Sequence, residues 1–187
     1  MRRRTLRHAL VVLSGALLSV ASLASTPDLG NFSVFGGGKL LKKDDWAPAD
    51  QQWDIGGQIA YQPANWPLGF AAAYFSSYGK GSTDFGEFKG YTHEIQLGLE
   101  KIWAVGRFSR PYVGGGVVLG KAEASLQTVQ DSDHAVGGWI GGGYTLVLAR
   151  HLALGIDSRY TYLPIRLFDT KGQGGGLHLG ATLGFAW

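Results

Sequence analysis

The stretch that decides the fold is Leu177 to Trp187, which reads LHLGATLGFAW. Its residues alternate between an apolar parity and a parity of small or polar side chains. This alternation of period two over eleven residues predicts a β-strand. A strand with one apolar face toward lipid and one small or polar face toward a lumen is typical of a membrane barrel. The apolar parity consists of Leu177, Leu179, Ala181, Leu183, Phe185 and Trp187, and the other of His178, Gly180, Thr182, Gly184 and Ala186.

Seven earlier stretches show the same alternation, each about ten residues long, the length that a tilted strand needs to cross a bilayer. Eight strands are an even number, as single-chain bacterial barrels have. The sequence therefore predicts an all-β fold, an eight-stranded antiparallel up-and-down transmembrane β-barrel. The seven stretches are 31–41, 51–61, 68–77, 91–103, 111–122, 136–149 and 152–162.

The connections between these stretches alternate in length. Those after the second, fourth and sixth are short, whereas the other four are long and polar. Short periplasmic turns and long outer loops have this rhythm, which places both chain ends on the periplasmic side. The long loops are predicted at 42–50, 78–90, 123–135 and 163–176.

Residues 1–24 form a predicted secretory leader. Four arginines precede an apolar run from Ala9 to Ala21. In Ser22-Leu23-Ala24, which follows, both positions that signal peptidase reads are small. A transmembrane anchor is the alternative, but the apolar run is too short. We expect cleavage after Ala24, which leaves residues 25–187 as a single barrel domain delivered to the bacterial outer membrane.

The composition narrows the possible functions. The 17 basic residues fall to 13 without the leader, against 14 acidic residues, so no basic surplus indicates a nucleic-acid partner. The chain has no cysteine, which excludes disulfides and cysteine-ligated metals. A secreted β-sandwich or lipocalin-like barrel also shows period two. Its polar parity would face water, but here that parity is mostly Gly, Ala and Thr, which suits the inside of a narrow barrel.

Several charged and polar residues fall on the parity that faces the lumen. Since unpaired buried charge is costly, they are expected to form a structural network of ion pairs. Arg159 is the expected centre, with Glu94, Glu100 or Asp157 as its partner and Lys39 as a second cation. A path for protons or small solutes along the same groups is the alternative. The predicted network consists of Asp54, Glu94, Gln96, Glu100, Asp157, Arg159 and His178, with Gln58 beside it.

No catalytic constellation emerges from the sequence. His93 and Glu94 are adjacent, so on a strand they point to opposite faces. Ser132-Asp133-His134 holds the residue types of a nucleophile site but lies in a polar loop, where such residues are common. We therefore predict no catalytic, cofactor-binding or metal-ligating residues and no cofactor.

From about residue 30 onward the chain resembles the small eight-stranded outer-membrane barrels of Gram-negative bacteria, of the OmpX/OmpA-transmembrane-domain type. The leader, the loop rhythm and the ending Gly180, Leu183, Phe185 and Trp187 carry this resemblance. That ending is similar to the C-terminal signal that such barrels present to the outer-membrane assembly machinery, although family members more often end in Phe. Residues 110–116 and 159–162 are loosely similar to lipid A deacylase barrels. The His-x-Ser pair of those enzymes is absent from this sequence.

The resemblance specifies the class of barrel and says little about its function. We predict a non-enzymatic outer-membrane barrel that contributes to envelope structure or to surface interaction through its outer loops. Its expected partners are outer-membrane lipid and lipopolysaccharide, and the assembly machinery during biogenesis, with no nucleic acid. The surface partner is unknown. Two alternatives stay open: a lipid A-modifying enzyme with an unrecognised site, and a narrow channel for small solutes.

Overall fold

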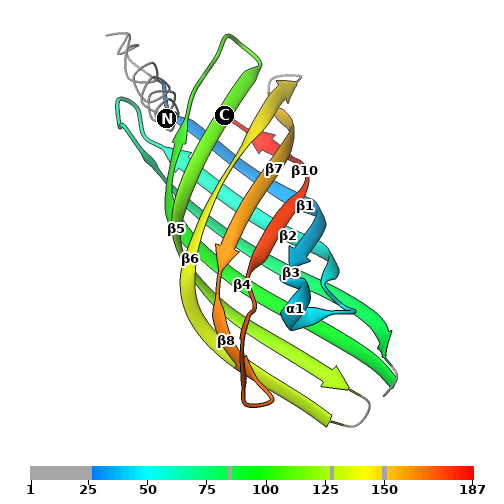
Figure 1. Cartoon of the computed structure of the whole chain (residues 1–187). Helices are drawn as coiled ribbons and strands as arrows, with labels where there is room; N and C mark the ends of the chain where they lie inside the picture. The colour runs from blue at the N-terminus through cyan, green and yellow to red at the C-terminus, as the bar shows by residue number, and fades with distance from the viewer. Residues whose placement is uncertain (1–26, 84–85, 127–128, 149–150) are drawn as a thin grey trace, which may run out of the picture.

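The computed structural model describes residues 27–83, 86–126, 129–148 and 151–187, so the predicted leader lies outside the described residues. Eight strands form a closed antiparallel barrel in the order β1-β10-β7-β6-β5-β4-β3-β2 (Figure 1). The predicted fold is confirmed. The barrel strands are β1 Leu29–Leu41, β2 Gln51–Gln62, β3 Gly69–Thr83, β4 Gly86–Ile102, β5 Ser109–Leu126, β6 Val129–Leu148, β7 Leu152–Tyr162 and β10 Gly176–Ala186.

The barrel closes where the last strand pairs with the first. Phe185 lies opposite Phe32 and Leu177 lies opposite Leu40, in a ladder without interruption between them. β10 also pairs with β7, so both edges of the final strand are used. Closure leaves no unpaired sheet edge, a requirement for a sheet that lies in lipid.

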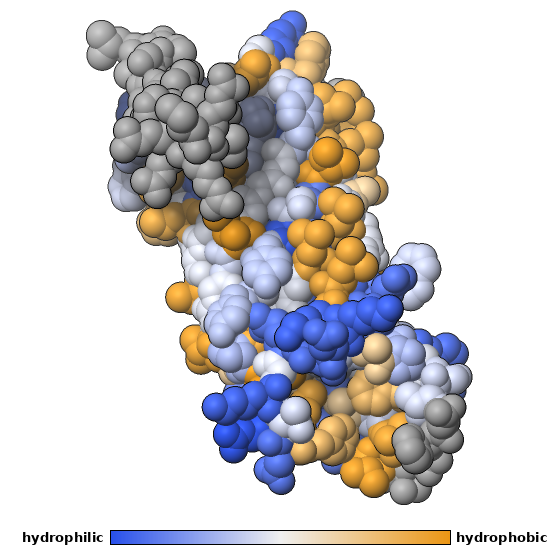
Figure 2. Space-filling view, in the orientation of Figure 1, coloured by the Kyte–Doolittle hydropathy of each residue, from blue (hydrophilic) through white to orange (hydrophobic). Residues whose placement is uncertain are grey.

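Side chains alternate across the barrel wall as the period-two pattern requires. On β2, Trp53 and Ile55 are 83% and 67% exposed, whereas Gln52 and Asp54 between and beside them are buried. Hydrophobic side chains cover the strands toward the chain ends, and hydrophilic ones gather over α1 (Figure 2). An apolar exterior around a polar interior is the reverse of a soluble protein's distribution. No helix in the described part of the chain has the length and apolar character to cross a membrane.

The two ends of the barrel differ. The start of β1, the end of β10 and the short connections lie at one end, here called the turn end, and the long hairpins extend from the other, the loop end (Figure 1). The loop end carries a short helix, α1 Lys43–Trp46, and a two-stranded hairpin of β8 Pro164–Leu167 and β9 Thr170–Gln173. α1 stops after one turn because Pro48 disfavours a helical conformation at Ala47.

The prediction that 78–90 and 123–135 are loops is wrong. Lys80 pairs with Lys89 on the β3–β4 hairpin, and Glu123 pairs with Ser132 on the β5–β6 hairpin. Backbone hydrogen bonds form this ladder and need no apolar side chains, so a register set within the barrel continues into polar sequence. The two hairpins therefore project well beyond the predicted strand ends. The predicted loops 42–50 and 163–176 are also partly ordered, as α1 and β8–β9.

Inward-facing glycines make room for large side chains in the narrow lumen. A Cβ atom on Gly98 would overlap the Trp139 ring, and one on Gly143 would overlap the Tyr112 ring. An eight-stranded barrel is only wide enough to be filled by its own side chains. The high glycine content thus belongs to the packing of the interior.

Candidate functional site: the lumen and the loop end

The seven polar residues expected in the lumen all lie inside the barrel, and each is at most 3% exposed. Lys39, Gln58 and Thr161 lie among them and are also buried. These side chains come from β1, β2, β4, β7 and β10. The contacts have two centres, Arg159 and His178. Gln96 links them, since it accepts from Arg159 Nη1 at 3.3 Å and donates to Glu94 Oε2 at 3.0 Å.

Arg159 is held by a bidentate contact with Asp157. Nε donates to Asp157 Oδ1 and Nη2 to Oδ2, both at 2.8 Å. The guanidinium also donates to Gln96 Oε1 at 3.3 Å and to Gln58 Oε1. Its carbon lies 5.2 Å from the Phe75 ring centroid and 5.1 Å from that of Trp139. A planar cation between two rings, with a bidentate carboxylate, is a role that arginine fills and lysine does not.

Of the three carboxylates considered as partners of Arg159, the structure selects Asp157. Glu94 pairs with Lys39 instead, with Nζ 2.6 Å from Oε1. Glu100 lies near the turn end beside Arg159 and Tyr112, where a cavity of about 10 Å³ remains. That volume corresponds to roughly one water molecule. Side chains thus leave almost no bore at this level of the barrel.

Lys39 connects the lumen to the loop end. Its ammonium donates to Glu94 Oε1, to Thr92 Oγ1 at 2.7 Å, and to the carbonyl of Gly174 at 3.0 Å. Gly174 follows β9, so one buried cation joins β1, β4 and the segment that leads into β10. The three acceptors compensate the cost of burying the charge.

His178 is the centre of the second cluster. Nδ1 lies 2.6 Å from Asp54 Oδ2, and Nε2 lies 3.3 Å from Thr161 Oγ1 and 3.4 Å from Glu94 Oε2. Asp54 accepts a second hydrogen bond from Ser77 Oγ at 2.9 Å. A carboxylate, an imidazole and a hydroxyl in sequence have the composition of a nucleophile site. His178 and Thr161 are fully buried, however, so no substrate reaches the hydroxyl in this conformation.

An apolar cluster closes the mouth of the lumen at the loop end. Trp46 of α1 and Leu163 and Ile165 at the start of the β8–β9 hairpin are all buried, together with Ala122 of β5. The Trp46 indole N–H donates to the carbonyl of Gln173 at 2.7 Å, which ties α1 to β9. Sequence reasoning missed this closure. The available signal was the presence of large apolar residues in two otherwise polar connections.

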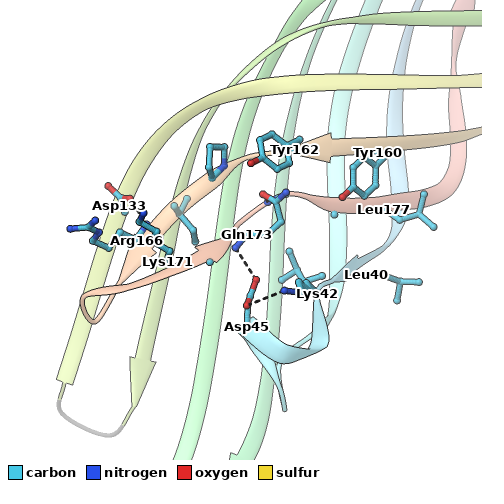
Figure 3. Close-up of a pocket in the computed structure, with 16 residues that line it drawn as sticks. Leu40, Lys42, Asp45, Asp133, Tyr160, Tyr162, Arg166, Lys171, Gln173 and Leu177 are labelled. Atoms are coloured by element: carbon cyan, nitrogen blue, oxygen red, sulfur yellow. Dashed lines mark hydrogen bonds and ion pairs between the residues drawn. The ribbon is translucent and has the colours of Figure 1, made fainter.

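An open hollow lies outside the barrel wall, between α1, the β8–β9 hairpin and the strands below them (Figure 3). It has a volume of about 860 Å³. We call it the lateral groove. Asp45 accepts the backbone N–H of Gln173 at 3.0 Å and so joins α1 to β9 across it. The groove is lined by residues that include Leu40, Lys42, Asp45, Asp133, Tyr160, Tyr162, Arg166, Lys171 and Leu177.

The chemistry-bearing residues of the predicted polar loop 123–135 do not converge on a reaction centre. Asp133 Oδ2 accepts the backbone N–H of Arg166 at 2.6 Å, and Asp131 Oδ2 accepts that of Phe168 at 2.6 Å. These carboxylates hold the β8–β9 hairpin against β6. In the described ranges, no group of three or more His, Asp or Glu side chains is arranged to hold a metal ion.

No protein-family model matches the sequence, and no curated protein matches it. Several solved structures match the fold. Neisserial surface protein A has a TM-score of 0.61 at 15% identity, over 86% of this chain and 97% of that one. OprG of Pseudomonas aeruginosa has 0.61 at 13%, over 87% and 97%. Ail, the attachment invasion locus protein of Yersinia pestis, has 0.55 at 17%, over 87% and 100%. The fold of this chain is that of the small eight-stranded outer-membrane barrels.

Proposed function

We propose that the chain is a non-enzymatic outer-membrane barrel that contributes to envelope structure and surface interaction through its loop end. The observation that carries the proposal is the combination of an apolar exterior with an interior filled by its own side chains. Such a barrel acts as an anchor, and the loop end is the surface that it presents outside the cell. We further propose that residues 1–24 are removed on export.

The apolar exterior supports a place in a bilayer. Outward-facing Ile55, Leu97, Val117, Ile140 and Ile156 are each about half exposed or more. So large a contiguous apolar surface on a soluble monomer would promote aggregation. Aromatic residues flank this band toward the turn end, including Tyr61, Trp103, Phe185 and Trp187, a position that interfacial girdles take in membrane barrels.

The filled interior disfavours both alternatives. A solute path needs continuous bore, yet Arg159, Phe75 and Trp139 are stacked across the lumen. An acyl-transfer or hydrolytic site needs an accessible nucleophile beside a base, and the hydroxyl that touches His178 is buried. The resemblance to an attachment protein adds support for a surface role, since Ail carries that description.

Expression of the full chain in a Gram-negative host tests the placement. We expect the mature protein to sediment with the outer membrane and to migrate differently on a gel before and after boiling. A protein found in the periplasm or cytosol would refute the proposal. The alternatives have their own measurements with the same purified barrel. Discrete conductance steps in planar bilayers would establish a channel, and fatty acid released from lipopolysaccharide, detected by mass spectrometry, would establish an enzyme.

The surface role is tested by attachment of host cells that display the barrel to cultured epithelial cells. The matched variant replaces residues 125–130 at the β5–β6 tip by a two-residue Asn-Gly turn. It shortens the hairpin beyond the barrel but keeps the Ala124–Asp131 pair and the hydrogen bond from Phe168 to Asp131. We expect the variant to reach the outer membrane in equal amount and to lose attachment. Equal attachment by both would remove the β5–β6 hairpin from the surface role.

A further inference from the structure

The floor of the lateral groove continues the apolar band of the barrel. Leu40, Leu177 and Tyr160 are direct cross-strand neighbours on β1, β10 and β7, and all three face outward. Leu40 and Tyr160 are each 49% exposed. β7 and β10 pair only as far as Tyr160 and Leu177, and beyond this point their chains diverge into β8 and β9. The groove lies at this fork, so an acyl chain reaches its floor from the bilayer without crossing water.

The rim of the groove carries a pair of opposed cations. Arg166 and Lys171 stand directly opposite each other on β8 and β9, and both side chains are exposed. Like charges in this arrangement destabilise a strand pair. No ion pair joins either side chain to a carboxylate anywhere in the described ranges.

Two other cations of the loop-end hairpins, Lys89 and Lys121, have carboxylate partners. Lys89 lies 2.8 Å from Glu87, and its hydrogen bond lowers the pKa of that carboxyl below its usual range. Lys121 forms a close ion pair with Glu123. The side chains of Arg166 and Lys171 thus differ from those of Lys89 and Lys121 in having no ion pair with a carboxylate.

The two acidic residues of the groove are already engaged with the backbone of the hairpin. Asp133 Oδ2 accepts the N–H of Arg166, and Asp45 Oδ2 accepts that of Gln173. Lys42, on the α1 side, adds a third cation 3.9 Å from Asp45. The rim therefore has three cations and two carboxylates, with the surplus positive charge on β8–β9 (Figure 3).

We propose that the lateral groove binds a phosphorylated glycolipid of the surrounding leaflet. One acyl chain lies over Leu40, Leu177 and Tyr160, and a phosphate lies between Arg166 and Lys171, where it relieves their repulsion. A neutral lipid would leave the cations unused, and a soluble anion would leave the apolar floor exposed. The groove volume is in the range of ordinary ligand sites, about 300–1,000 Å³. The inference rests on the proposed outer-membrane placement and names a lipid partner for it.

Native mass spectrometry of the folded full barrel, released from a neutral detergent, tests this site. Three probes are titrated: bisphosphorylated hexa-acyl lipid A, the same lipid without phosphates, and the glucosamine disaccharide bisphosphate without acyl chains. We expect one copy of the first to bind about tenfold more tightly than either other probe, as expected for charge-assisted hydrogen bonds to one phosphate. Equal binding of the phosphorylated and dephosphorylated lipids would overturn the proposal without recourse to any variant.

The variant Arg166→Gln/Lys171→Gln removes the rim charges, and Lys80→Gln/Lys89→Gln is its control. The control pair also consists of opposed cations on a loop-end hairpin, at a distance from the groove in sequence and sheet order. Heat-modifiable migration verifies that each variant is folded. We expect the groove variant to lose about tenfold in affinity for bisphosphorylated lipid A, and the control to keep its affinity. If both variants lose the same affinity for the lipid, the effect comes from net charge and the proposed site is overturned. If the barrel reaches the outer membrane but shows no preference for the phosphorylated lipid, only the proposed lipid site in the groove is refuted. If the barrel never reaches the outer membrane, the proposed function is refuted.

Discussion

His178 Nδ1 lies 2.6 Å from Asp54 Oδ2, although 124 positions separate the two residues in the chain. His178 is on β10 and Asp54 on β2, and β1 lies between these strands in the sheet. The contact therefore spans the point at which the first and last strands close the barrel. Both side chains are buried, so neither the carboxylate nor the imidazole can replace the other by water.

We predict that Asp54→Ala lowers the free energy of unfolding by about 3 kcal/mol. The substitution leaves the buried His178 Nδ1 and Ser77 Oγ without their acceptor, and an orphaned buried polar group is costly. Urea unfolding of the barrel in lipid vesicles, followed by tryptophan fluorescence, measures the change. Asp44→Ala on the exposed side of α1 is the control and should change stability by under about 0.5 kcal/mol. Similar values for both would show that the Asp54–His178 contact does not stabilise closure.

Arg159→Lys should also destabilise the barrel, by about 2 kcal/mol or more, because lysine cannot reproduce the bidentate contact with Asp157 or the stacking on Phe75 and Trp139. The same unfolding experiment measures this loss. Arg107→Lys is a matched control, since Arg107 also lies over a ring, that of Phe108, but at the exposed turn end. If the two substitutions cost the same, the guanidinium geometry inside the lumen contributes nothing specific.

The barrel itself could be predicted because every spanning strand repeats one local pattern. In 177–187, as in 52–61, each outward position is apolar or small and each inward one is small or polar, so strand number and facing follow from the sequence alone. The β1–β10 ladder shows that the final stretch closes the barrel against Phe32 to Leu40. Pairing of first with last is the one arrangement that leaves no edge in lipid.

The partners within the lumen could not be predicted in the same way. Alternation shows that Glu94 and Arg159 face inward but not at which height along the tilted strands they lie. Glu94 meets Lys39 and His178, whereas Arg159 meets Asp157, two positions before it on the same strand. The loop end was less predictable still. Trp46 closes the mouth through a contact with Gln173, and no local period connects positions so far apart.

The orientation of the barrel is testable because the chain has no cysteine of its own. We predict that Ser125→Cys, on the β5–β6 hairpin, reacts with a membrane-impermeant maleimide on intact cells. Ala64→Cys, in the short connection between β2 and β3, should react only after the outer membrane is permeabilised. Both positions are exposed or half-buried at opposite ends of the barrel, so the comparison reports side rather than burial. Labelling of Ala64→Cys on intact cells would show that the turn end faces the cell exterior and would contradict the proposed orientation.

The final strand allows the assembly signal to be separated from ordinary stability. Phe185 and Leu179 both face outward from β10 with similar exposure, but only Phe185 belongs to the ending proposed as the signal, with Gly180, Leu183 and Trp187. In the folded barrel Phe185 stacks on His151, with ring centroids 4.6 Å apart, so truncation also removes some packing. We predict that Phe185→Ala lowers the amount of heat-modifiable protein in cells several-fold more than Leu179→Ala does. Both purified variants should refold in detergent with similar yields. A matching refolding defect in Phe185→Ala would assign the residue to stability, and equal cellular amounts of the two variants would remove it from the signal.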